Sequence, residues 1–218
     1  LTLTTNTVMV GSKGRQIELD NFAARDSKGN LTNSGILYSV DVSGNITIGS
    51  GKSFVTTANT VYTLRGDISV TNADIIFNGP TVLTSATSTL TTTGTGSVTI
   101  LNALNGGGNA LVINNADANS MVSGMLGNLS SLTKSGTGTL TLTANNIYTG
   151  NTIINGGVLR VGSGSTTGAI GTGSVTNNGS LVFDRSNSYT VVGTVSGTGS
   201  VTQQGAGTLI VNGVNTYS

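Results

Sequence analysis

Apolar and polar residues alternate along the whole chain in short runs that are bounded by Gly, Asn or Ser. Typical runs are 45–49, 67–71, 73–79, 96–100, 110–114 and 208–212. Alternation over three to six residues, repeated at a spacing of about ten, is typical of short β-strands joined by tight turns. The pattern therefore predicts an all-β chain made of many short strands.

Internal repetition indicates how these strands are arranged. Residues 134–149 align without a gap on residues 203–218, and the two copies share Gly, Thr, Leu, Asn and Tyr in register. A shorter Gly-Thr-Gly-Ser-Val-Thr sequence begins at 94, 171 and 197. Each unit is too small to bury its own apolar face, so we expect the repeats to stack as a parallel β-solenoid. A β-sandwich is the alternative, and the absence of long alternating strands disfavours it.

The composition agrees with a narrow, repeating interior. The chain has 33 Gly among 218 residues, and aromatic residues make up only 4%. Three strands and about 20 residues per coil would give about ten coils and a rod of about 50 Å. In such a stack, Asn and Thr side chains lie above one another and satisfy each other's hydrogen bonds.

Several classes of function are disfavoured by the residues that are missing. The chain has no Cys and no His, which removes disulfides, thiolate nucleophiles and the commonest metal ligands. A net charge of +1 does not suit a nucleic-acid partner. The longest apolar runs are of about four residues, against roughly 20 in a membrane-spanning helix. We therefore expect no cofactor, no metal, no nucleic acid and no membrane span.

Catalysis would have to rest on eight acidic residues that are spread along the chain. Only Glu18 and Asp20 are spaced to share one face of a strand, whereas glycoside hydrolysis needs two carboxylates about 5–10 Å apart. The Gly-rich segment 105–109 lacks the Lys-Ser/Thr pair of a phosphate-binding loop. We expect that the chain is not an enzyme.

One segment carries a family resemblance. Residues 132–162 contain a Lys-x-Gly-x-Gly-Thr-Leu-Thr-Leu opening, an Asn-x-Tyr-Thr-Gly middle and an Asn-Gly-Gly-x-Leu-Arg-Val close, in that order. This segment resembles the passenger-associated transport repeat of Gram-negative autotransporters. A second copy begins near Val201 and is cut at Ser218. We divide the chain into divergent coils at 1–131, with a possible loop excursion at 13–30, and repeat coils at 132–218.

The resemblance implies a right-handed parallel β-helix that is the passenger of an autotransporter. It also implies export through a C-terminal outer-membrane barrel, absent from this fragment, followed by display at the bacterial surface or release. The lack of Cys suits this route, because disulfides formed in the periplasm would obstruct the threading of an unfolded chain.

Two segments are candidate receptor contacts. The stretch from Lys13 to Lys28 holds seven of the seventeen charged residues, among them Arg15 and Arg25, and we interpret it as a loop or a short helical excursion. It is either a partner-binding excursion, with these four basic residues as contacts, or simply a solvated loop.

The second segment is Arg65-Gly66-Asp67, which lies between two apolar runs. On an exposed turn, it would offer a cation and a metal-coordinating oxygen to an integrin-type receptor. Alternatively, Arg65 and Asp67 form a polar corner and pair with neighbouring coils.

The resulting hypothesis is a passenger that acts as an adhesin or as a ligand for a host cell-surface receptor or the extracellular matrix. The alternative is a structural passenger that self-associates through Thr and Asn faces and so causes autoaggregation or biofilm formation.

Overall fold

The fold is a stack of parallel β-coils. The structure is a computed structural model, and it describes residues 2–3, 7–10, 17–18, 38–42, 44–56, 58, 60–116, 120–212 and 215–217. Every regular element among these residues is a β-strand, and every strand pair is parallel. This confirms the predicted β-solenoid.

Three long sheets form the sides of the solenoid. Sheet A contains β1 (Thr2–Leu3), β4 (Tyr38–Val42), β7 (Thr60–Leu64), β10 (Thr81–Leu83), β13 (Leu104–Asn105) and β16 (Leu126–Gly127). Sheet B contains β2 (Thr7–Val10), β5 (Asn45–Ile48), β8 (Ile68–Thr71), β11 (Thr87–Thr93), β14 (Ala110–Asn115), β17 (Ser131–Ser135), β19 (Asn151–Ile154), β21 (Val175–Asn177), β24 (Val195–Gly197) and β27 (Thr216–Tyr217).

Sheet C contains β3 (Ile17–Glu18), β6 (Phe54–Val55), β9 (Ile75–Phe77), β12 (Val98–Ile100), β15 (Ser120–Val122), β18 (Thr139–Leu142), β20 (Val158–Ser165), β22 (Ser180–Arg185) and β25 (Ser200–Gln203). A fourth, two-stranded sheet pairs β23 (Tyr189–Val191) with β26 (Leu209–Val211).

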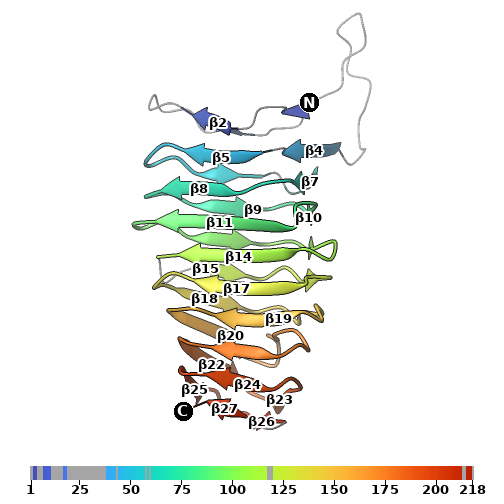
Figure 1. Cartoon of the computed structure of the whole chain (residues 1–218), viewed down its shortest axis with the longest axis vertical. Helices are drawn as coiled ribbons and strands as arrows, with labels where there is room; N and C mark the ends of the chain where they lie inside the picture. The colour runs from blue at the N-terminus through green and yellow to red at the C-terminus, as the bar shows by residue number, and fades with distance from the viewer. Residues whose placement is uncertain are drawn as a thin grey trace, which may run out of the picture.

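The register gives the length of a coil. Ile46 pairs with Ile68, which is 22 residues further on, and Lys134 pairs with Ile154, which is 20 residues further on. Sheet B, with ten strands, agrees with the expected number of about ten coils. In Figure 1 the strands in front and behind run in opposite directions as the chain descends, and their sense makes the solenoid right-handed.

The alternation seen in the sequence becomes an inward and an outward face. In β11 the residues Ser88, Leu90 and Thr92 are buried, and the Thr residues between them face outward. Inward residues of successive coils stack into columns, because parallel strands in register place like positions above one another. One column of sheet B runs through Ile46, Ile68, Leu90, Ile113, Lys134, Ile154 and Asn177.

Lys134 interrupts this apolar column as a fully buried cation. Its Nζ donates to the carbonyl oxygens of Ser135 at 2.6 Å, Gly136 at 2.9 Å and Gly156 at 3.3 Å. These acceptors carry no formal charge, so burial lowers the pKa of the Lys134 ammonium to about 8. The Lys of the repeat opening is therefore a structural residue that satisfies the carbonyl groups of two neighbouring turns.

This burial makes stability depend on pH. The unfolded chain keeps the Lys134 proton up to pH 10.5, whereas the folded protein releases it near pH 8. The unfolding free energy should therefore rise between pH 8 and pH 10, by roughly 2–3 kcal/mol. Above pH 10 the trend reverses, because burial raises the pKa of Tyr148 from 10.0 to about 12 and stability is lost towards that value.

Denaturant unfolding across this pH range measures the effect, and Lys134→Met is the matched variant because it keeps the aliphatic length. The rise between pH 8 and pH 10 should be absent in Lys134→Met. The same rise in both proteins would assign it to another group.

The two repeat copies occupy different sides of the solenoid. Residues 131–135 of the first copy form β17 in sheet B, whereas 200–203 of the second form β25 in sheet C. Residue 197 lies in sheet B, three coils after Lys134 in the same column. Residue 203, the counterpart of Lys134 in the second copy, comes six residues later and therefore falls in sheet C. Gln203 nevertheless resembles Lys134 in its role, because its Nε2 donates to the carbonyl oxygens of Gly205 and Gly207.

The expected boundary between residues 131 and 132 falls within β17, and β17 pairs with β14 along its length. The solenoid continues across this point, as Figure 1 shows. The division into 1–131 and 132–218 therefore remains a prediction from sequence alone.

Candidate binding surfaces

The corner at Arg65-Gly66-Asp67 joins β7 to β8 and is packed against the coil before it. The Arg65 side chain is exposed, Gly66 is buried and Asp67 is half-buried. A Cβ on Gly66 would lie 2.3 Å from the carbonyl oxygen of Gly44, so only Gly fits there. The tripeptide therefore lies close to the body of the solenoid at its middle residue.

Asp67 takes part in a ladder of side-chain caps that links three coils. Asn45 Oδ1 accepts the backbone N–H of Asp67 at 2.9 Å, and Asp67 Oδ1 accepts the backbone N–H of Thr89 at 2.7 Å. These contacts favour the polar-corner interpretation of Asp67. Recognition of the tripeptide by an integrin-type receptor stays a prediction.

Asp67→Asn separates the two roles of the carboxylate. Asn keeps an Oδ1 that can accept from Thr89, as Asn45 does from Asp67, but it loses the charge that a receptor-bound metal ion would need. The variant should fold with an unfolding free energy within about 0.5 kcal/mol of the parent. Asp67→Ala should lose about 1–2 kcal/mol, because the Thr89 N–H loses its acceptor.

Thermal unfolding and binding to integrin-bearing cells are measured together on both variants. Unchanged cell binding by folded Asp67→Asn would remove the integrin hypothesis. Loss of binding by that variant, with its melting temperature unchanged, would establish it.

The other sequence candidates, Lys13, Arg15, Arg25 and Lys28, lie outside the described residues, as does most of the expected excursion at 13–30. Their role as receptor contacts stays a prediction.

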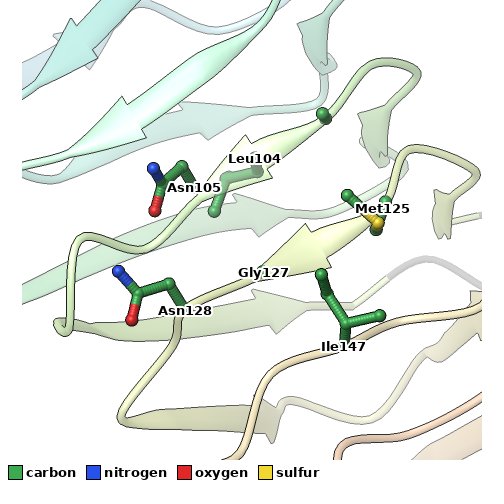
Figure 2. A pocket seen from close by; sticks show the side chains of 7 residues that line it. Leu104, Asn105, Met125, Gly127, Asn128 and Ile147 are labelled. Carbon is green, nitrogen blue, oxygen red and sulfur yellow. The ribbon is translucent and has the colours of Figure 1, made fainter.

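A shallow apolar depression lies on the outer face of sheet A, at the end of its regular strands. It has a volume of about 260 Å³. Figure 2 shows the two Asn side chains at one end, and Met125 and Ile147 at the other. The Met125 side chain is 42% exposed and that of Ile147 is 61% exposed. The lining residues are Ala103, Leu104, Asn105, Met125, Gly127, Asn128 and Ile147.

The depression arises from a missing side chain and a missing strand. In the outward column of sheet A, Asn105 is followed by Gly127, which leaves a notch. The next coil has no strand on this side. Its chain passes here at Ile147, whose N–H donates to the carbonyl oxygen of Leu126 at 3.0 Å. Asn146 replaces part of the lost pairing, because its Oδ1 accepts the Leu126 N–H and its Nδ2 donates to the carbonyl of Ala169.

The outer face of sheet B is flat and uncharged over its described strands from β5 to β24. Its outward residues are short Thr, Ser and Asn side chains with a few aliphatic ones. In one column they lie in register across seven coils. That column contains Thr89, Val112, Thr133, Ile153, Thr176, Ser196 and Thr216.

A third feature is an exposed segment at 163–167, which comprises the end of β20 and the two residues after it and which a buried arginine anchors. Arg185 donates through Nη2 to the carbonyl of Thr166 at 2.6 Å and through Nη1 to that of Gly168. Its guanidinium carbon lies 4.8 Å from the centre of the Tyr189 ring. Sequence reasoning missed Arg185, since a single Arg in a strand carries no signal of the segment it holds.

The titratable groups do not gather into a recognisable catalytic or metal-binding cluster within the described ranges. No group of three or more carboxylate residues comes together there. Arg160 and Asp184 form an ion pair at 2.5 Å. In the part that the structure describes, no helix is long and apolar enough to span a membrane.

The comparisons with known proteins agree with the stacked repeats. The passenger-associated-transport-repeat family model matches residues 132–161 and 201–218. The chain is 44% identical over 68 residues to "Adhesin BmaC autotransporter" of Brucella suis biovar 1 (strain 1330). This match covers 31% of the chain and 2% of that protein. No solved structure matches the chain. Residues 132–161 and 201–218 are therefore passenger-associated transport repeats, and these matches support a segment of an autotransporter passenger that is exported through an outer-membrane barrel and displayed at the cell surface or secreted.

Proposed function

We propose that this passenger segment is an adhesin whose rod binds a host cell-surface or matrix partner through the depression on sheet A. The similarity to an adhesin supports the class of function. The observation that carries the site is the presence of two exposed large apolar side chains, Met125 and Ile147, in one depression. Large contiguous apolar patches mark interaction sites, and two large apolar side chains in one depression form a small patch of this kind.

The geometry suits an apolar group of the partner that is flanked by amide hydrogen-bonding groups. Residues Leu104 and Gly127 line the depression, while Asn105 and Asn128 present side-chain amides at one end (Figure 2). Such a mixture of an apolar centre and a few polar groups is typical of a binding site. The partner's contact would be an aliphatic or aromatic side chain that enters beside Met125 and Ile147.

The double variant Met125→Ser and Ile147→Ser tests this site. Binding of the purified chain to host cells should fall at least about tenfold, because two apolar contacts are removed. Val192→Ser is the matched control, because Val192 is 62% exposed but does not line the depression. Equal binding by the folded double variant would exclude the depression as the adhesive site.

Self-association is the second candidate function, and the uncharged face of sheet B favours it. Two copies could meet face to face there without burying a charge, and the regular column of short polar and aliphatic side chains would align with itself. Sedimentation at increasing concentration measures the association. Thr133→Lys and Thr176→Lys place like charges on this column and should abolish it. Concentration-independent monomers of the parent chain would rule this function out.

A further inference from the structure

Four Asn-Gly steps lie within the described residues, and they differ in what the glycine N–H does. This dipeptide is chemically labile, since the glycine amide nitrogen can attack the Asn side chain when it is not otherwise held. Three of the four glycine N–H groups donate a hydrogen bond. Gly79 donates to Thr56 Oγ1 at 3.3 Å, Gly106 to the carbonyl of Gly127 at 2.8 Å, and Gly179 to Asn177 Oδ1 at 3.1 Å.

Asn155-Gly156 is the exception. The Asn155 side chain is exposed, and the Gly156 N–H donates to no other residue within the described ranges. The surroundings hold the main chain on both sides of this step. The Asn155 N–H donates to the carbonyl of Lys134 at 2.9 Å, and the carbonyl of Gly156 accepts from Lys134 Nζ at 3.3 Å.

We propose that Asn155 is a site of spontaneous deamidation in the folded protein. The Gly156 nitrogen forms a bond to Cγ of Asn155, and the side-chain amide leaves as ammonia. Water then opens the resulting succinimide at one of its two carbonyl carbons. Opening at the side-chain carbonyl carbon gives Asp, and opening at the main-chain carbonyl carbon gives isoaspartate. The reaction needs no oxidant or reductant.

The product changes a defined part of the surface. Asn155 follows β19 directly and has the same outward orientation as Ile153 in that strand. Deamidation places a carboxylate at the margin of the uncharged sheet B face. It also places a negative charge one peptide unit from the carbonyl that binds the Lys134 ammonium. The reaction itself is independent of whether that face binds a second copy.

Gly156→Ala provides a control that the fold accepts. A Cβ at residue 156 would meet only the carbonyl oxygen of Gly136, at the ordinary contact distance of 3.6 Å. The φ angle of Gly156 is not in the left-handed region, unlike that of Gly157 at 65°. The methyl group hinders the approach of the nitrogen to Cγ, so the variant should fold normally and deamidate more slowly.

Incubation of the whole chain in mildly alkaline buffer, followed by peptide mass spectrometry, tests the proposal. Asn155 should deamidate about tenfold faster than Asn105 or Asn178, because those sites must first break a hydrogen bond. The Gly156→Ala variant should deamidate more slowly at Asn155, and the difference between the sites of the parent chain should disappear in denaturant. Equal rates at the three sites in the folded chain, or slower reaction at Asn155, would overturn the proposal.

Discussion

Gly124→Ala should unfold far more readily than the parent chain. An added Cβ at residue 124 would lie 1.8 Å from the carbonyl oxygen of Asn102 and 2.3 Å from its carbon. These atoms belong to the backbone of the coil before it, so the only way to relieve the clash is to separate two coils. We expect a loss of about 3 kcal/mol in the unfolding free energy, at the upper end of overpacking costs.

Gly127→Ala is the matched substitution three residues away. Its Cβ would meet only the side chain of Ile147, at 3.6 Å, so the two coils keep their spacing. Denaturant unfolding of both variants measures the difference. If the two variants were equally stable, the close stacking of coils at residue 124 would be wrong.

Tyr148→Ala should have an effect of similar or larger size. Tyr148 is fully buried, and its hydroxyl lies 2.8 Å from Thr152 Oγ1. A Cβ on Gly171 would lie 2.3 Å from the Tyr148 ring, so the ring packs directly against the next coil. Removal of the ring from this site should cost about 3–5 kcal/mol.

Tyr148→Phe separates the ring from the hydroxyl. It keeps the packing against Gly171 but leaves Thr152 Oγ1 without this partner, so a loss of about 1–2 kcal/mol is expected. Thermal or denaturant unfolding gives both values. If Tyr148→Phe were as unstable as Tyr148→Ala, the hydroxyl would matter more than the ring.

The fold could be predicted because a solenoid repeats its rules in every coil. The alternating runs 67–71 and 96–100 became β8 and β12, in which buried and outward residues alternate. Tyr148, which recurs in register in the second copy, is fully buried, because an aromatic residue in a small repeating unit has few places other than the interior.

The surfaces could not be predicted in the same way, because they depend on which residues of neighbouring coils lie side by side. The depression needs Gly127 to lie beside Ile147, and these two residues are in different coils with no pattern that links them. Lys134 was visible in the repeat opening, but its burial against three carbonyl groups follows only from the turns around it. Asp67 accepts the Thr89 N–H, a capping contact whose partner the tripeptide alone does not specify.

Coil register generates every surface described above, and distances along one column measure it most directly. The chain has no Cys, so spin labels can be attached to cysteines introduced at Thr89 and at one of Thr176, Ser196 or Thr216. These three partners lie in consecutive coils of sheet B. The stacked account predicts distances of about 19, 24 and 29 Å, with a constant step near 4.8 Å. Distances that do not increase by a constant step from coil to coil would contradict it.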